Sequence, residues 1–216
     1  MANDYTTSTD AFADISEGGY SSSDSPVMAT FVTVASRMID AELGRWPGFF
    51  YPSTADETRY YDGNGEQELP IDEFVSITSV SVSEQGGVAS SDYTAWTSTD
   101  YYVAPYNYSS NGKPINRLVV DVVNGSKPCW YGYRKAVQVV GVPGYVKSST
   151  DGSWTPPDLI VQATKTQALR WFLRAKQGWQ DVGGNDELGK RYYKGSTELD
   201  PDVKLMLWPI KLELDR

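Results

Sequence analysis

The feature that most constrains the fold of this chain is the order of its predicted helices and strands. Apolar periodicity predicts an amphipathic helix at about residues 27–43 and a second one at about 157–177, with β-type and turn sequence between them. A short third helix at 203–207 and an apolar tail follow. The two main helices therefore read as one small bundle that a β segment interrupts. We expect an α+β fold: a small α-helical bundle interrupted by a large antiparallel β insertion, with an extended C-terminal tail.

Start and stop signals frame the first helix. Asp24 supplies a capping side chain, Pro26 suits the first helical turn, and Gly44 fits the C-terminal cap. The apolar residues between them form two adjoining stripes at spacings of three and four, which merge into one face that we expect to be buried. The stripes are Val27, Phe31, Val34 and Met38, and Met28, Val32, Ala35, Ile39 and Leu43.

The second helix carries a wide apolar stripe that includes Leu159 and Leu173. Asp158 is stabilised by the positive, N-terminal end of the helix dipole, and Arg170 and Arg174 by its negative, C-terminal end. We expect the two helices to pack together although they are far apart in sequence. The predicted core of the bundle consists of Phe31, Met38, Ile39, Leu169 and Phe172.

Between the helices, β-branched and aromatic runs alternate with turns rich in Gly, Pro and Asn. The alternation slips between Ile77 and Val80, which predicts a β-bulge or a bend. Residues 136–142 are almost wholly apolar, which predicts a strand buried on both faces. The expected strands are 58–61, 68–71, 74–83, 101–104, 117–123 and 136–142.

These signals divide the chain into five segments. The first is polar and rich in Ser, Thr and Asp, which predicts a flexible arm. In the last, Ile210, Leu212 and Leu214 share one face if the chain is extended. The segments are an N-terminal arm at 1–24, the first helix and loop of the helical domain at 25–56, the β insertion at 57–148, the continued helical domain at 149–209 and the C-terminal tail at 210–216.

Composition excludes several classes of function. The net charge of −9 disfavours binding to nucleic acid through phosphate neutralisation. The chain has no histidine, so the commonest general base and transition-metal ligand is missing, and one cysteine, Cys129, cannot form an internal disulfide. No run is apolar enough to span a membrane, and the N-terminus lacks the pattern of a signal peptide.

Few residues form a pattern that could carry chemistry. Asp62, Asn64 and Glu66 begin like a calcium loop but lack the distal Glu, and Asn-Gly between strands favours a tight turn instead. Asp72 and Glu73 are adjacent on a strand and point to opposite faces, so they cannot flank one glycosidic bond. We therefore expect no catalytic site, no cofactor and no metal, and a protein that is not an enzyme.

The β segment is crowded with aromatic residues. Core packing explains them most simply, and a protein–protein surface or a sugar-stacking platform are the alternatives. A carbohydrate-binding β module that uses surface Tyr and Trp therefore remains the alternative function. The residues are Tyr93, Trp96, Tyr101, Tyr102, Tyr106, Tyr108, Trp130, Tyr131 and Tyr133.

Several segments, in this order, resemble the head–tail adaptor (connector) proteins of long-tailed bacteriophages. The resemblance covers about residues 27–209 and rests on the order of the segments, because each of them is short. Departures are the long polar N-terminal arm and the Trp208-Pro209-Ile210 ending. The segments are Ala35-Ser36-Arg37-Met38-Ile39-Asp40, Thr58-Arg59-Tyr60-Tyr61-Asp62-Gly63, Leu69-Pro70-Ile71-Asp72-Glu73-Phe74, Tyr101-Tyr102-Val103-Ala104-Pro105, Val137-Gln138-Val139-Val140-Gly141-Val142-Pro143-Gly144-Tyr145, Pro156-Pro157-Asp158-Leu159-Ile160 and Pro201-Asp202-Val203-Lys204-Leu205-Met206-Leu207.

The resemblance implies a structural virion protein at the head–tail neck, assembled in the host bacterial cytoplasm. Such proteins form a homo-oligomeric ring, expected to be twelve-fold, that docks under the portal protein and extends the DNA channel towards the tail. A stopper or tail-completion protein would lie below it. Double-stranded DNA would pass through the lumen without specific binding, and no membrane would be involved.

The resemblance also implies that the C-terminal segment grips the portal, with Trp208 as the anchor. The apolar residues there are too many for a short segment to bury alone, which favours a contact surface. The alternative is that the tail folds back on its own subunit. The predicted portal-binding residues are Val203, Leu207, Trp208, Ile210, Leu212 and Leu214.

Overall fold

The computed structural model describes residues 3–13, 22–87, 89–148, 154–176 and 199–214. It has helices and an antiparallel sheet, so the α+β class is confirmed. Its contacts divide the chain into a helical unit, Met1–Gly48 with Pro156–Arg216, and a β unit, Phe49–Thr155. The five segments drawn from the sequence stay a prediction, apart from the two corrections below.

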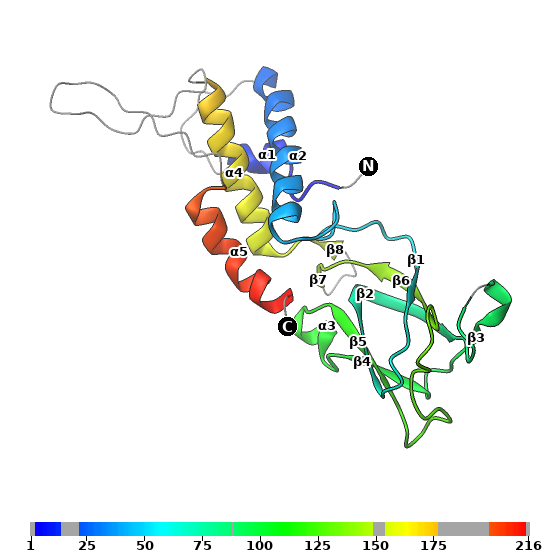
Figure 1. Cartoon of the computed structure of the whole chain (residues 1–216). Helices are drawn as coiled ribbons and strands as arrows, with labels where there is room; N and C mark the ends of the chain where they lie inside the picture. The colour runs from blue at the N-terminus through cyan, green and yellow to red at the C-terminus, as the bar shows by residue number, and fades with distance from the viewer. Residues whose placement is uncertain (1–2, 14–21, 88, 149–153, 177–198, 215–216) are drawn as a thin grey trace. The chain divides into compact units, whose positions relative to one another are not determined.

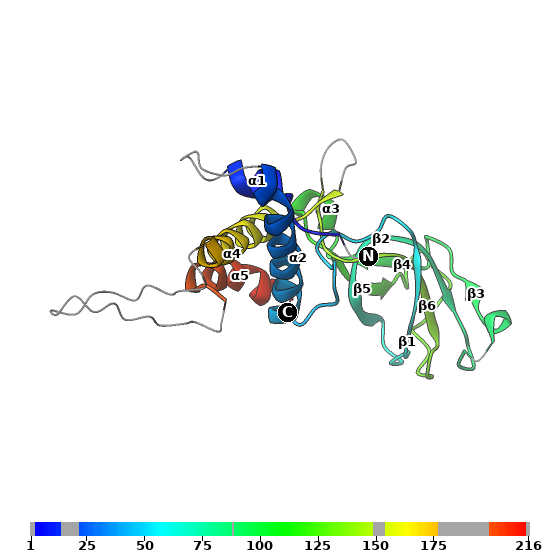
Figure 2. The same cartoon turned by 90° about the horizontal axis from the view of Figure 1, so that it is seen from above.

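The helical unit is built from two long helices and two shorter ones (Figure 1). Helix α2, Ser25–Glu42, packs along α4, Asp158–Lys176, and α4 also contacts α5, Pro201–Leu214. Figure 2 shows the short α1, Ser8–Ala13, beside α2 and α4, both of which it contacts. A single turn of 3-10 helix, Ser22–Asp24, leads into α2.

Helix α2 buries only one of its two apolar stripes. Met28, Val32 and Ala35 are buried against Ala168 and Phe172 of α4. The other stripe was expected to merge with it, and this is wrong in part, because Val27 and Val34 are exposed. The two stripes together are wider than the surface that the neighbouring elements cover.

The β unit contains one antiparallel sheet of six strands in the order β1-β6-β2-β5-β4, with β3 paired to β2. A two-stranded ribbon, β7 with β8, and the short α3, Tyr108–Asn111, complete it. The strands are β1, Glu57–Tyr61, β2, Glu68–Val82, β3, Thr94–Ala95, β4, Tyr101–Ala104, β5, Ile115–Val120, β6, Val137–Pro143, β7, Lys147–Ser148, and β8, Trp154–Thr155.

The long strand β2 replaces two strands that were expected at 68–71 and 74–83. Its register against β6 shifts between Ile77 and Ser79, which confirms the predicted bulge. Gly141 lies opposite: a Cβ there would stand 2.3 Å from the carbonyl oxygen of Ser76, so only glycine fits this close approach. The core of the sheet includes Phe74, Val80, Leu118, Trp130 and Val139.

The described part of the C-terminal tail is helical, so the prediction of an extended tail is wrong for residues 210–214; residues 215 and 216 lie outside the described ranges. Helix α5 continues through Pro209 to Leu214. Val203, Leu207 and Ile210 follow one another at spacings of four and three, and all three are buried. This helical period outweighs the alternation of Ile210, Leu212 and Leu214, and burial of the helix face compensates for the backbone hydrogen bond that proline cannot donate.

The flexible arm predicted at 1–24 is also wrong for residues 3–13, which dock on the helical unit; residues 14–21 lie outside the described ranges. Tyr5 and Ala11 are buried, and the ring of Phe12 meets that of Phe172 edge-on at 5.3 Å. A few apolar side chains thus anchor a segment that is polar on average.

Candidate functional site

The described residues contain no group of three or more His, Cys, Asp or Glu side chains placed to hold a metal ion. The side chains at the suspected calcium loop serve the local backbone instead. Asn64 donates to the carbonyl of Glu68 at 2.7 Å and accepts from the amide of Glu66 at 3.0 Å, while Asp62 accepts from the amide of Lys135 at 2.8 Å. The helices of the described ranges are all too short or too polar to cross a bilayer. The candidate site is the set of apolar side chains exposed on the helices.

The residues predicted to form the helical core all lie on α2 and α4. Ile39 and Phe172 are fully buried. Phe31 and Leu169 are half-buried and pack against the cluster around Phe172, and Met38 is also half-buried. Phe31, Leu169 and Phe172 thus belong to the cluster between α2 and α4. That Met38 and Ile39 join the same core stays a prediction.

The start of α5 is fastened to α4. Asp200 donates its amide to the side-chain oxygen of Gln167 at 2.9 Å, and its carboxylate forms an ion pair with Arg170. The same carboxylate caps the helix, accepting from the amide of Asp202 at 2.9 Å. Gln167 is buried, so this contact fixes where α5 begins on the surface of α4.

The predicted portal-binding residues divide into two groups on α5. Val203, Leu207 and Ile210 face inwards and hold the helix to its own subunit, whereas Trp208 is 60 % exposed. Leu212 and Leu214 lie in the last turn, and their side chains are not among those described.

Leu205 was not among the residues predicted to bind the portal. It lies three residues before Trp208 and is 72 % exposed. Side chains three apart share a helix face, so the two residues form one apolar surface, here called the α5 patch. The spacing would have shown it if the helix had been predicted to run past Leu207.

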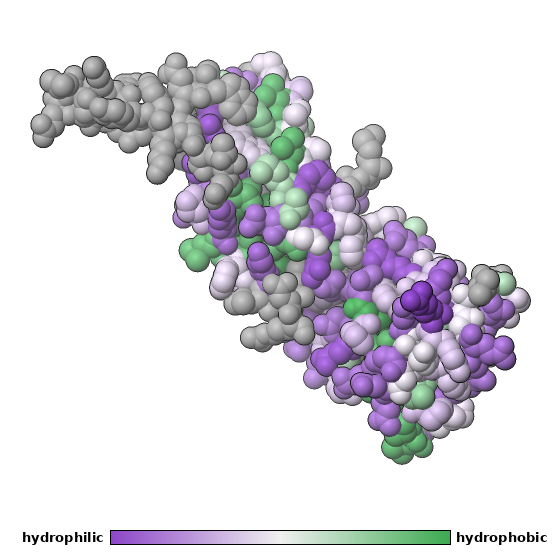
Figure 3. Space-filling view, in the orientation of Figure 1, coloured by the Kyte–Doolittle hydropathy of each residue, from purple (hydrophilic) through white to green (hydrophobic). Residues whose placement is uncertain are grey.

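Further apolar side chains are exposed on the long helices. Val27 and Val34 lie on the outer stripe of α2, and Figure 3 shows apolar surface along this helix. Leu159 and Leu173 are exposed on α4. Contiguous apolar surface of this kind marks contact sites more often than single exposed side chains do.

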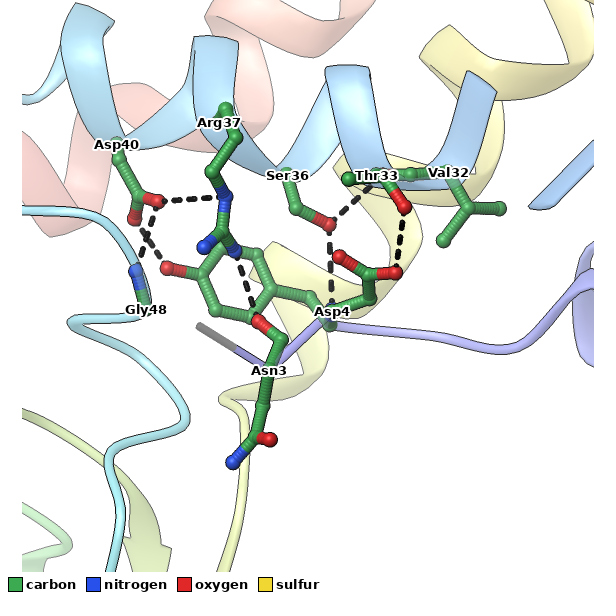
Figure 4. A network of polar contacts seen from close by, with 9 residues as sticks. Asn3, Asp4, Val32, Thr33, Ser36, Arg37, Asp40 and Gly48 are labelled. Carbon is green, nitrogen blue, oxygen red and sulfur yellow. Dashed lines mark hydrogen bonds and ion pairs between the residues drawn. The ribbon is translucent and has the colours of Figure 1, made fainter. Parts of the chain in front are cut away.

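A polar network fastens the N-terminal segment to α2 (Figure 4). The amide of Tyr5 donates to the hydroxyl of Ser36 at 3.2 Å, and the phenol of Tyr5 donates to the carboxyl of Asp40. Arg37 donates to the carbonyl of Asn3 at 2.8 Å. Together these bonds hold residues 3–5 against about one turn of the helix.

Asp40 is the centre of this network. Its carboxyl also accepts from the amide of Gly48 at 3.1 Å and pairs with Arg37 at 3.3 Å. Burial raises the pKa of Asp40, against the lowering effects of the hydrogen bonds from Tyr5 and Gly48 and of the charge on Arg37. The network joins the N-terminal segment, α2 and the residues that follow α2.

In the β unit, the two tryptophans of the aromatic crowd are core residues. Trp96 and Trp130 are buried and stacked, with ring centroids 4.6 Å apart. The exposed aromatics are tyrosines, and Tyr102 and Tyr106 meet edge-on, at 85°, and so do not form a flat platform. The arrangement gives no support to a sugar-stacking surface built on tryptophan.

No model of a known protein family matches the chain, and no curated protein matches it either. Among solved structures, it is similar to a chain of the structure described as "Neck of empty GTA particle computed with C6 symmetry", with 13 % sequence identity. The match covers 93 % of this chain and 100 % of that chain, with a TM-score of 0.42. At this identity and TM-score the likeness carries no conclusion about function.

Proposed function

We propose that this chain is a structural, non-enzymatic protein of a bacteriophage-type virion: a head–tail adaptor that forms a ring under the portal and extends the DNA channel towards the tail. The observation that carries this proposal is the ordered series of segments across residues 27–209 that resembles the adaptor family. Apolar side chains exposed on α2, α4 and α5 support it, since a ring subunit needs contact surfaces on several sides.

The α5 patch is the proposed contact with the portal. Leu205 and Trp208 project from a helix whose opposite face is buried, so the patch is presented on a rigid support. Tryptophan in such a position is a frequent hot spot, because it buries a large area with little loss of conformational freedom. The buried residues Val203, Leu207 and Ile210 would act indirectly, by holding the helix in place.

The charges of the helical unit agree with a lumen through which DNA slides. Arg170 pairs with Asp200, and Lys176 pairs with Asp24 at 2.5 Å, both within the subunit. Cations that form ion pairs within the subunit contribute less to the binding of DNA phosphates. The net charge of −9 also disfavours this binding. A tail-side partner, a stopper or tail-completion protein, belongs to the same proposal.

Co-sedimentation with portal rings of the same particle tests the contact. We expect the wild-type chain to sediment with the rings and Trp208→Ala to lose most of this binding, with an unchanged melting temperature because Trp208 is exposed. Tyr133→Ala, which removes an exposed aromatic of the β unit, is the matched control and should bind as the wild type does.

Equal binding by Trp208→Ala would rule out the α5 patch as the contact, and absence of binding by the wild type would contradict the adaptor itself. A point substitution is preferable to truncation after Leu207, because truncation removes the buried Ile210 and would confuse folding with binding.

A further inference from the structure

Two valines project from the β unit at the loop that follows β5. Val122 is 50 % exposed and Val123 is 85 % exposed, although the residues on either side of the loop are tied to the sheet. We call these two side chains the valine knob. Adjacent exposed valines at a loop tip are unusual, because loops on a free surface are mostly polar.

The loop that carries the knob is held rigidly by Asp121. Its carboxylate accepts from the amides of Val123 at 2.9 Å and Asn124 at 3.0 Å, from the Asn124 side chain at 2.9 Å and from the hydroxyl of Tyr102 at 2.5 Å. These hydrogen bonds, with that from Tyr102 first, hold the pKa of Asp121 well below its usual range. The carboxylate is therefore ionised at neutral pH and keeps the turn closed.

A second aspartate fixes the far side of the loop. The buried Asp100 accepts from the amide and hydroxyl of Ser126 at 3.0 and 3.2 Å, and from the amide and hydroxyl of Thr97 at 2.9 and 2.7 Å. These bonds lower the pKa of Asp100 to about 2. Between the two aspartates, a Cβ on Gly125 would stand 2.5 Å from the carbonyl oxygen of Asp121, so the chain here is closely packed. A preordered loop loses little entropy when it binds.

The same unit contains a partly open pocket of about 180 Å³. Its apolar lining comes from Val75, Pro114, Val146 and Trp154, and Ser109 and Lys113 stand among its polar lining. A cavity of about 150 Å³ in another protein holds benzene, which has six carbons, and the two side chains of the knob also have six carbons. The pocket is therefore large enough for the knob.

A subunit cannot place its own knob in its own pocket. Pro114 of the pocket immediately precedes β5, Ile115–Val120, and the knob follows the end of this strand. Six residues of extended strand span about 20 Å at about 3.3 Å per residue. A knob that fills the pocket must therefore belong to a second copy of the chain.

We propose that the valine knob of one subunit inserts into this pocket of the next subunit, making a head-to-tail contact between β units. The occupant is a second copy of the chain, because the chain presents both a rigid apolar projection and a pocket of matching size at opposite ends of one strand. A heterologous contact of this kind generates a ring when the rotation closes. Closure into a ring rests on the proposed function, whereas the contact itself does not.

Disulfide trapping tests the contact, with Cys129→Ser as the background so that the native thiol plays no part. Val123→Cys places a thiol on the knob, and Ser109→Cys places one at the pocket. The distance along β5 exceeds the Cα separation of roughly 4.4–6.8 Å that a disulfide allows, so any disulfide between the two positions joins different subunits. The chain carrying both substitutions should give a ladder of dimers, trimers and larger species under mild oxidation, and a mixture of the two single variants should give dimers only.

The matched control pairs Val123→Cys with Thr58→Cys, an exposed position on the edge strand β1, and should crosslink severalfold more slowly. Adding Val122→Ala to the knob variant should reduce crosslinking with Ser109→Cys towards this control rate, since the smaller side chain buries less apolar area in the pocket. Circular dichroism and the melting temperature verify that each variant is folded.

Equal rates for Ser109→Cys and Thr58→Cys would overturn the contact, as would a predominant dimer of Val123→Cys alone, which indicates knobs that meet each other. The readout needs no portal, so the two proposals fail separately. A crosslinked ladder without portal binding would contradict the adaptor role alone, and portal binding without the ladder would contradict the knob contact alone.

Discussion

At the scale of single residues, the pKa values of buried carboxyls shift in opposite directions in the two units. In the β unit, Asp100 and Asp121 each close a turn and are stabilised as anions by several donors. In the helical unit, burial dominates at Asp40, so its anion is disfavoured although Tyr5, Gly48 and Arg37 all interact with it. Sequence reading identified none of the three, because the partners of each are set by the fold.

Asp40 gives the folded protein a characteristic dependence on pH. Since its pKa is raised in the folded state, the folded state holds this proton more tightly than the unfolded chain does. The stability it contributes is present below the ordinary pKa and is lost as the pH rises through the raised one. We expect the free energy of unfolding of the wild type, minus that of Asp40→Asn, to fall in urea denaturation as the pH rises above the ordinary carboxyl pKa of about 4.

A difference that is constant or rises over this range would mean that the donors around Asp40 outweigh its burial. Subtracting the values of Asp40→Asn removes the contributions of the other titratable groups, because both proteins contain the same remaining carboxyls.

At the scale of helices and strands, sequence patterns predicted the elements that have one dominant periodicity. The helices expected at 27–43 and 157–177 appear as α2 and α4, within two residues at each end. The bulge at Ile77 was also predictable, because it interrupts a clear alternation. In these places local pattern and tertiary packing require the same structure.

The C-terminal segment was not predictable in the same way, because two periods overlap in it. Val203, Leu207 and Ile210 have the spacing of a helix, while Ile210, Leu212 and Leu214 alternate as in a strand. Pro209 cannot donate the backbone hydrogen bond of a helix, yet α5 continues through it. Only packing against α4 separates the two possibilities, and the α5 patch depends on this outcome.

Helix α5 offers a matched pair of substitutions. Leu207→Ala removes a buried side chain and should lower the free energy of unfolding by about 2–5 kcal/mol, whereas Leu205→Ala, on the exposed face, should change it by less than about 0.5 kcal/mol. Chemical denaturation of the full chain measures both values. Similar losses for the two variants would indicate that α5 does not pack through Leu207.

At the scale of the whole molecule, the chain is acidic, and Arg170 and Lys176 of α4 are engaged in ion pairs within the subunit. Both features favour a surface that DNA passes without being held. The exposed apolar residues lie on both units, which is expected of a subunit whose neighbours are other proteins.

The isolated protein should therefore not bind duplex DNA tightly at physiological salt. Fluorescence anisotropy with a labelled duplex should show no saturation at micromolar protein, because an acidic chain releases few counterions from the phosphates. Saturable binding that weakens steeply with added salt would contradict a passive channel and would point to a basic surface that the net charge conceals.

Mass photometry of purified portal rings, titrated with the full chain, tests the adaptor role most directly. We predict that the ring mass rises and then saturates when one copy of the chain has been added for each portal subunit, which is twelve copies on a twelve-fold portal. We also predict that Trp208→Ala requires a much higher concentration to reach the same mass. A portal mass that does not change, or one that rises without saturating at one chain per portal subunit, would contradict the proposed ring.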